Sequence, residues 1–369
     1  MQKRYVLMNK NHIVLNTVYD DELQAFTAIK PINLQFAPPA IAKPDGTTDK
    51  RLLNEWWNDR AVPVSRMPRT KAKDELMANL GLSLSDQYWM NPDGLEYNNI
   101  NLFEHGVSPI SMRSPAETGS YSPEASTGGD LPKHWQKENG TWFLVKQGSG
   151  TLKQEPYNEA VATALHKRLL KPDEYVPYEV KDGTSVCPNM LRDSEELVTA
   201  WDIIKNIKRP NHINDFNHCL GVLSQALADD AGTRLEKMFA CDFILANSDR
   251  HYRNFGLMRD TDSMRYTRMA PIFDSGSCLW YDKPRLEYAA DFDYQTKPFG
   301  YAPDIMLAKF HDFSWFDPDK LKGFTEEAAG ILSQNPYLPE QRLNAIIKGL
   351  SINIDEITRH AESCRAKAL

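Results

Sequence analysis

The chain begins with two apolar segments joined by a turn. Residues 4–8 (RYVLM) and 12–16 (HIVLN) are largely apolar, and the Asn-Lys-Asn between them is typical of a tight turn, so the pattern predicts a β-hairpin. A Pro-rich connection follows, and the apolar spacing over 51–82 predicts two helices, the second ended by Gly81. We expect Trp56 and Trp57 of the first helix to fill core rather than bind a ligand.

The composition changes between residues 113 and 130, where 11 of the 18 residues are Ser, Thr, Pro or Gly. Such a segment buries little apolar surface, so we expect a mobile loop. Residues 141–146 (TWFLVK) then predict a strand that carries Lys146. A glycine-containing loop leading to a strand with a lysine is an arrangement that covers nucleotide phosphates, because backbone N–H groups and one point charge face the anion.

A helical pattern follows from residue 156 to about 170, with Glu159 in its first turn. Glu159 either pairs with Lys146 or is a solvated acid favoured by the helix dipole. The segments 175–180 and 184–191 then predict two strands around a Lys-Asp-Gly turn. Further helices are predicted over the ranges 195–207, 216–228 and 233–245.

The residues from 241 to 280 carry the candidate chemistry. Asp249 and Asn254 lie in a polar loop between two apolar runs. Asp274 follows the short apolar run 269–273, and Gly276 after it permits a sharp turn, which predicts a carboxylate at a strand end. One carboxylate to accept a hydroxyl proton, with an amide oxygen and a second carboxylate to hold Mg²⁺, is a set that phosphoryl transfer needs.

Composition narrows the possible classes of protein further. The 369 residues suffice for two or three packed units, and a net charge of −7 does not suggest a nucleic-acid-binding face. Five cysteines without a C-x-x-C pair favour neither a disulfide framework nor a zinc site. No apolar stretch reaches the length of a membrane span, so we expect a soluble, cytoplasmic protein.

The remaining helical patterns cover 320–333, 339–350 and 355–368, and 275–300 is irregular.

Two strings resemble a known family. Asp249-Arg250-His251 with Asn254, and Ile272-Phe273-Asp274, resemble the catalytic and metal-binding segments of the HipA-like serine/threonine kinases. The resemblance implies an α+β, two-lobed protein-kinase-like fold with an extra N-terminal subdomain and a mainly helical C-terminal lobe. On this interpretation residues 1–110 form the subdomain, 111–190 the N-lobe with the Gly-rich loop, and 191–369 the C-lobe.

The resemblance also assigns roles. It makes Asp249 the catalytic base, and Asn254 and Asp274 the Mg²⁺ ligands. ATP would be bound by Lys146 with Glu159, by the Gly-rich loop, and by a hinge for which the candidates are Asn189, Met190 and Leu191. His251 more plausibly bonds the loop backbone than moves a proton.

The loop itself resembles the Ser-Gly-Pro-Lys loop of the same family. It reads Ser126-Thr127-Gly128-Gly129-Asp130-Leu131-Pro132-Lys133, and it departs from the usual kinase G-x-G-x-x-G. The resemblance implies autophosphorylation at a serine of this loop, best matched by Ser126, with Thr127 as the nearer rival.

Partners and alternatives follow from the family. HipA-like kinases act on protein substrates and often pair with a DNA-binding antitoxin, so we expect DNA contact only through such a partner, and no membrane contact. The Asp-Arg-His-x-x-Asn string also occurs in phosphatidylinositol kinases, so a lipid or small-molecule kinase is an alternative. A pseudokinase that only binds a partner is another, although the set of charged residues is intact.

Overall fold

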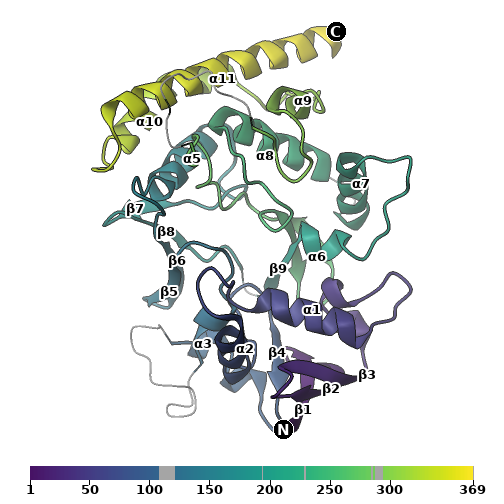
Figure 1. Ribbon diagram of the computed structural model, residues 1–369. Coiled ribbons are helices and arrows are strands. Elements are labelled where there is room, and N and C mark those ends of the chain that lie inside the picture. Colours follow the sequence, from purple (N-terminus) through teal and green to yellow (C-terminus); the bar gives the residue numbers. More distant parts are fainter. Residues whose placement is uncertain (108–120, 193, 228–229, 284–285, 287–293, 369) are drawn as a thin grey trace. The chain divides into compact units, whose positions relative to one another are not determined.

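The computed structural model of the chain describes residues 1–369 except 108–120, 193, 228–229, 284–285, 287–293 and 369 (Figure 1). It divides into two compact units. Unit 1 consists of residues 1–145, 189–209 and 257–268, and unit 2 of residues 146–188, 210–256 and 269–369. The chain therefore passes between the units several times.

Unit 1 is built on an antiparallel sheet with the strand order β3-β2-β1-β4. Its strands are β1 (Gln2–Asn9), β2 (His12–Asp20), β3 (Ala25–Pro31) and β4 (Tyr88–Asn91). The predicted hairpin is confirmed, because Asn9 pairs with His12 and leaves two residues in the turn. The first of these, Lys10, has a φ of 47°.

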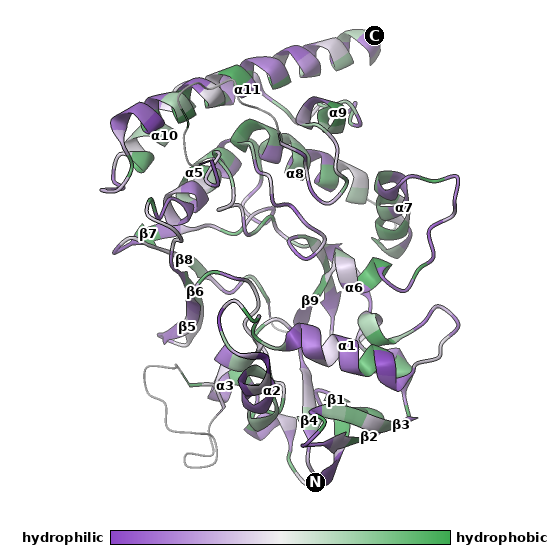
Figure 2. Ribbon diagram, in the orientation of Figure 1, coloured by the Kyte–Doolittle hydropathy of each residue, from purple (hydrophilic) through white to green (hydrophobic). Residues whose placement is uncertain are grey.

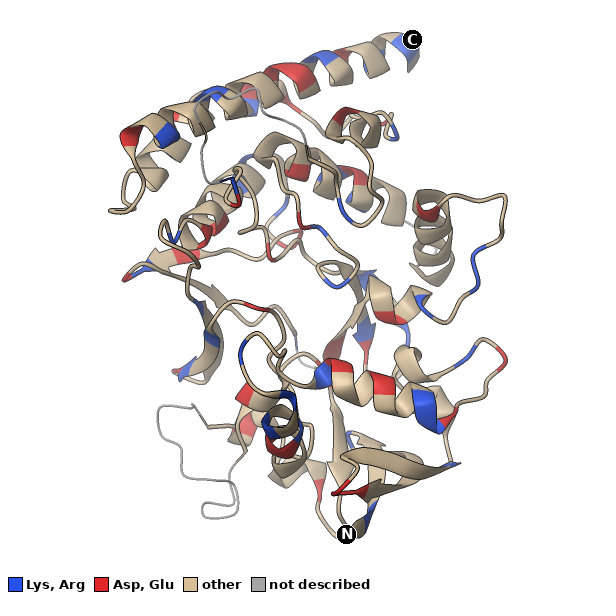
Figure 3. Cartoon of the chain, viewed as in Figure 1, with Lys and Arg blue, Asp and Glu red and all other residues tan. Residues whose placement is uncertain are grey.

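The helices of unit 1 pack with its sheet to form the apolar core. The two predicted helices are present as α1 (Lys50–Arg60) and α2 (Arg69–Ala78), and α3 (Leu102–His105) follows them. Trp56 and Trp57 are buried in the core between α1 and the sheet, which confirms their predicted packing role. In Figure 3, α1 carries both basic and acidic residues.

Two further pieces of sheet belong mainly to unit 1. The strand β5 (Lys133–Glu138), which the sequence analysis did not predict, precedes β6 (Thr141–Lys146), which it did. A three-stranded sheet has the order β11-β10-β9, from β9 (Glu195–Thr199), β10 (Gly256–Asp260) and β11 (Tyr266–Met269).

The helix predicted over 195–207 is wrong in its first half, where β9 stands, and only α6 (Ala200–Ile204) is helical. The reason is a tertiary contact. Glu196 is fully buried on β9, and its Oε1 accepts from Arg259 Nε on β10 at 2.7 Å. A buried pair of this kind overrides the weak helix propensity of the segment.

Unit 2 is mainly helical. It holds the hairpin β7 (Glu179–Lys181) and β8 (Thr184–Pro188). Its helices are α5 (Glu155–Leu169), α7 (Asp215–Leu227), α8 (Ala231–Leu245), α9 (Pro303–Leu307), α10 (Phe324–Leu332) and α11 (Glu340–Ala368). Helix α8 contacts α5, α7, α9 and α11, and it is buried along most of its length.

The two predicted C-terminal helices are a single one, α11 (Figure 2). Apolar and polar residues alternate along it without a break. Asn353, at the predicted interruption, is buried and donates through Nδ2 to the carbonyls of Phe243 and Ile244 at the end of α8. This contact holds the middle of α11 to the core, so the helix continues. No helix among the described residues is long and apolar enough to cross a membrane.

Candidate active site

The 249–254 loop begins where α8 ends. Ala246 closes the helix in the left-handed conformation with a φ of 51°. Asn247 then links helix and loop, because its Nδ2 donates to Asp242 Oδ1 at 2.8 Å and its Oδ1 accepts from the Asp249 N–H at 3.1 Å. Asn254 closes the loop by donating from Nδ2 to the Asp249 carbonyl at 3.1 Å. The backbone on both sides of the Asp249 side chain is therefore fixed.

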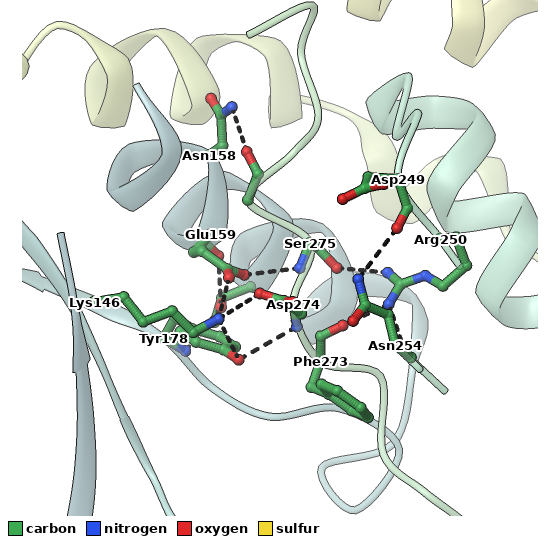
Figure 4. A network of polar contacts seen from close by, with 12 residues as sticks. Lys146, Asn158, Glu159, Tyr178, Asp249, Arg250, Asn254, Phe273, Asp274 and Ser275 are labelled. Atoms are coloured by element: carbon green, nitrogen blue, oxygen red, sulfur yellow. Dashed lines mark hydrogen bonds and ion pairs between the residues drawn. The ribbon is translucent and has the colours of Figure 1, made fainter. Parts of the chain in front are cut away.

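Arg250 is the buried centre of this region, with 1% of its surface exposed. Its Nε and Nη2 bond both carboxylate oxygens of Asp242, at 2.9 and 3.0 Å. The other N–H groups donate to the Asn254 carbonyl at 3.0 Å, the Phe273 carbonyl, and Ser275 Oγ at 2.9 Å (Figure 4). All five guanidinium donors are thus used, and they join the 249–254 loop to residues 273–275.

Asp274 and Glu159 both contact Lys146. The lysine Nζ lies 2.6 Å from Asp274 Oδ1 and 3.0 Å from Glu159 Oε1, so the predicted Lys146–Glu159 pair is confirmed (Figure 4). Glu159 lies in the second turn of α5 rather than the first. Burial opposes the charge on Lys146, but the two carboxylates outweigh it and raise the pKa of the lysine. Lys146 therefore carries a fixed positive charge.

Tyr178 supports the same cluster. Its hydroxyl accepts from the Asp274 N–H at 3.3 Å and from Lys146 Nζ at 3.4 Å, and the lysine also lies 4.8 Å from the centre of its ring. Burial raises the pKa of Tyr178, so the hydroxyl stays neutral.

The backbone around Asp274 differs from the prediction. β11 ends at Met269, and Ile272 makes only an isolated parallel bridge with Tyr175, so Asp274 does not end a regular strand. The left-handed residue is Asp274 itself, with a φ of 56°, and not Gly276. Gly276 is needed for space, because a Cβ there would lie 3.2 Å from the Glu155 carbonyl oxygen and from Glu159 Cγ.

The predicted Mg²⁺ ligands have oxygen donors of the right kind. The NH₂ group of Asn254 bonds the Asp249 carbonyl, while no described residue donates to its Oδ1. Asp274 contributes a carboxylate that is 37% exposed. Mg²⁺ is commonly held by one or two protein oxygens plus water and phosphate, so this pair fits it. Among the described residues, no group of three or more His, Cys, Asp or Glu could hold a metal.

His251 behaves as predicted. Its Nδ1 accepts from the Arg253 N–H at 3.2 Å, within the loop backbone. Burial lowers the pKa of His251, which keeps the ring neutral and Nδ1 free to accept.

The described part of the Gly-rich loop lies in unit 1 and is packed rather than open. Residues Pro123–Ser126 form a short 3₁₀ helix. Ser126 Oγ donates to the Leu82 carbonyl at 2.7 Å, and the buried Thr127 donates to the Pro123 carbonyl at 2.8 Å. The start of the predicted loop, with Arg113, lies outside the described residues.

Two residues of that loop are glycines with different surroundings. Gly128 has open space where a Cβ would be, whereas Gly129 has a φ of 85° and Lys133 Nζ 2.3 Å from its Cβ position. Arg66 fixes this part of the loop by donating to the Thr127 carbonyl at 2.7 Å. Residues 121–130 are therefore held by hydrogen bonds that the sequence did not predict.

The hinge candidates Asn189, Met190 and Leu191 also lie in unit 1. The Asn189 N–H donates to the Trp142 carbonyl at 2.8 Å, its Nδ2 to the Leu84 carbonyl at 3.1 Å, and its Oδ1 accepts from the Leu191 N–H at 3.2 Å. These groups of Asn189 already have partners, and Met190 is half-buried.

The sequence analysis gave no role to Asp242, Tyr178 or Lys297, nor to Arg250 beyond its place in the motif. Lys297 Nζ lies 2.7 Å from Asp249 Oδ1. Of these residues, only Asp242 could have been found from the sequence. It is a carboxylate within the otherwise apolar end of a predicted helix, and an arginine that could pair with it follows eight residues later.

Comparisons with known proteins test the family resemblance and the fold. No protein-family model matches the chain. A stretch of 43 residues, 12% of the chain, is 51% identical to the serine/threonine-protein kinase CtkA of Helicobacter pylori and spans only 13% of that relative.

Solved structures extend the similarity. The crystal structure of the H. pylori proinflammatory kinase CtkA matches with a TM-score of 0.51 at 18% identity, over 66% of this chain and 94% of that one. A chain of the Shewanella oneidensis HipA–HipB toxin–antitoxin complex with operator DNA matches with a TM-score of 0.54 at 13% identity, over 98% and 99%. The chain shares the fold of these proteins. The resemblance to HipA-like kinases is thereby confirmed for the mixed α/β fold.

Proposed function

We propose that the chain is an ATP- and Mg²⁺-dependent serine/threonine protein kinase of the HipA-like type. The observation that carries the proposal is the polar network in unit 2, in which Arg250 ties the Asp249 loop to the Asp274 segment. A base, a metal-ligand pair and a fixed lysine are the parts that phosphoryl transfer requires, since catalysis there is mostly positioning and charge.

Each residue has a distinct task in this proposal. Asp249 orients the acceptor hydroxyl and takes its proton. Asn254 and Asp274 hold Mg²⁺, which when bound neutralises charge on the phosphates. Lys146, kept charged by its two carboxylates, exchanges one of them for a phosphate oxygen when the nucleotide enters. The proposal keeps the expected nucleotide-binding roles of the Gly-rich loop at Ser126–Gly129 and of the hinge near Met190.

The decisive experiment compares the parent with Asp249→Asn, using labelled ATP, Mg²⁺ and a host lysate. The loop bonds at residue 249 use its backbone N–H and carbonyl, so the variant keeps them. We expect phosphoryl transfer to fall by on the order of 10² to 10⁴, because the shape stays and the proton acceptor is lost. Asp319→Asn, at an exposed aspartate, is the control.

A Mg²⁺ titration tests the ligands separately. Asn254→Ala and Asp274→Ala should each require more Mg²⁺ for half-maximal turnover, since each removes an oxygen that a hard cation prefers. Unaltered Mg²⁺ dependence in both variants would exclude them as ligands, and full activity of Asp249→Asn would exclude the kinase assignment.

Autophosphorylation forms part of the proposal, at Ser126 with Thr127 as the rival. The Ser126 hydroxyl must first leave the Leu82 carbonyl. A phosphate there adds a charge of about −1.5 to −2 and should reduce activity. Mass spectrometry after incubation with Mg²⁺ and ATP should find phosphate within residues 114–127 in the parent and none in Asp249→Asn. A mass spectrum without phosphate in this range, from a parent protein that transfers phosphate to other proteins, would contradict the proposed autophosphorylation.

The partner proposal rests on the HipA relative, whose structure contains HipB and operator DNA. By analogy this chain would be the toxin of a pair and would contact DNA only through a DNA-binding antitoxin. Two results would support this partner proposal. The chain should co-purify with such a protein, and the complex should bind operator DNA while the chain alone does not.

A further inference from the structure

Lys297 forms an ion pair with the side chain of Asp249. Its Nζ lies 2.7 Å from Oδ1, and the two side chains are 59% and 30% exposed. An exposed pair contributes little to stability, because water and salt screen it. Stability alone is therefore a poor reason for holding a lysine at this carboxylate.

The turn that carries Lys297 is fixed by its own contacts. The Thr296 N–H donates to the Tyr301 carbonyl, and the Gly300 N–H donates to the Thr296 carbonyl, both at 2.8 Å. Phe299 packs against Tyr252 of the 249–254 loop, with ring centres 5.8 Å apart. It also packs edge-on against Phe216 of α7, at 5.4 Å.

The same turn also meets the polar network. Lys297 and Arg250 line one small pocket together with Asp242 and Thr296. The backbone that presents Lys297 is thus attached to the loop that presents Asp249. The lysine is placed at the carboxylate by packing, and not only by the attraction between the charges.

The chemistry of the proposed reaction gives this placement a purpose. An acceptor oxygen must come within about 2.6–3.2 Å of Asp249, and the phosphorus about 3–3.5 Å beyond it. A long, flexible lysine held 2.7 Å from Oδ1 can then reach the phosphoryl oxygens, where negative charge is spread in the transition state. A lysine has three N–H donors, so it can contact Asp249 and a phosphoryl oxygen together.

We propose that Lys297 is a further catalytic residue, an inference that rests on the proposed kinase function. In the step, the acceptor oxygen forms a bond to the γ-phosphorus while the bond from that phosphorus to the bridging oxygen breaks. ADP leaves with that electron pair, and the hydroxyl proton passes to Asp249. Lys297 stabilises the charge on the oxygens of the transferred group and holds Asp249 in place for the incoming hydroxyl.

Kinetics of Lys297→Met and Lys297→Arg test this role against a matched lysine. Lys322 is also exposed and has an aspartate partner at 3.0 Å, so Lys322→Met is the control. We expect Lys297→Met to lower kcat by on the order of 10- to 100-fold with a much smaller change in the KM for ATP, because one charge-stabilising donor is lost. Lys297→Arg should recover part of kcat, and Lys322→Met should match the parent.

A second readout does not depend on activity. Trace acetylation followed by mass spectrometry reports the fraction of each lysine present as free amine. The hydrogen bond and charge of Asp249 raise the pKa of Lys297. In Asp249→Asn the labelling of Lys297 relative to Lys322 should therefore rise by about twofold or more.

The outcomes separate the two claims. If the parent transfers no phosphate, the kinase function fails and the role of Lys297 fails with it. If the parent is active and Lys297→Met is equally active, only the role of Lys297 is overturned. A Lys297→Met variant more active than the parent would also overturn it, because the pair would then be an inhibitory contact. Unchanged labelling in Asp249→Asn would show that the ion pair does not form.

Discussion

Replacing Arg250 with lysine tests whether one buried guanidinium holds the two loops of the site together. The substitution keeps the positive charge beside Asp242 but removes the planar fork. Lysine offers three donors from a single atom, whereas Arg250 makes five hydrogen bonds from three atoms. At least two of the five acceptors, which are both oxygens of Asp242, the carbonyls of Asn254 and Phe273, and Ser275 Oγ, would lose this donor in a buried site.

The expected cost follows from those lost bonds. A buried acceptor left without a partner costs about 1–3 kcal/mol, so two of them predict a loss of about 2–6 kcal/mol. Arg250→Met also leaves the Asp242 charge uncompensated, which predicts about 3–5 kcal/mol. The double variant of Arg250→Met and Asp242→Asn should recover part of that loss, because the unpaired negative charge of Asp242 is then absent.

Hydrogen exchange measured by mass spectrometry is the suitable assay, because it reports local opening in unit 2 without assuming that both units unfold together. A loss of about 3 kcal/mol speeds exchange by on the order of 100-fold in peptides covering 249–256 and 270–278. Arg359→Lys, at an exposed arginine of α11, should change exchange little. Exchange in Arg250→Lys within about threefold of the parent would refute the view that the fork joins these loops.

Three further predictions concern the surroundings of the site. Tyr178→Phe removes the acceptor for the Asp274 N–H. It should weaken the local structure by about 1–2 kcal/mol and raise the KM for Mg²⁺-ATP. Unchanged amide hydrogen exchange in residues 272–276 would contradict this prediction. Gly276→Ala should destabilise unit 2 by about 1–3 kcal/mol in urea unfolding, whereas Gly330→Ala in α10, where space is open, should stabilise it. Burial lowers the pKa of His166 to about 3, so the unfolded chain takes up a proton below pH 6.5 and the native state does not. The contribution of His166 to the free energy of unfolding is fully present above pH 6.5 and is about 2 kcal/mol smaller at pH 5. His166→Gln should lose that part of the pH dependence of stability.

The sequence predicted the residues that stand in recognisable local strings and missed those that no string marks. Asp249 and Asn254 stand five apart in one loop, and apolar runs on both sides mark its ends. Lys297 meets Asp249 across 48 residues, and Tyr178 meets Asp274 across 96, so no periodicity or motif connects them. Their contacts arise from packing that a single sequence does not encode locally.

The errors in the fold have the same origin. Residues 195–199 have ordinary helical spacing, but the buried Glu196 meets Arg259 through its Oε1 in a sheet. The predicted break in α11 fell at 351–354, where nothing in the sequence shows that Asn353 would bond the end of α8. In both cases a polar side chain found a buried partner more than 60 residues away, and that contact decided the local structure.

The conformation of Asp274 shows how much of the site depends on residues that do no chemistry. A left-handed φ of 56° is unfavourable for a residue with a side chain, although Asp tolerates it better than most. Here the three consecutive residues are each held. The Phe273 carbonyl accepts from Arg250, the Asp274 N–H donates to Tyr178, and the Ser275 N–H donates to Glu159 Oε2 at 3.1 Å.

Because each neighbour is fixed by a buried group, the strained residue between them has little freedom to relax. Its carboxylate is therefore directed at Lys146, and an alanine scan restricted to the candidate catalytic residues would miss the cause. The geometry of Asp274 should respond as strongly to Arg250 and Tyr178 as to any residue proposed to bind the nucleotide, since they set the backbone from which the carboxylate projects.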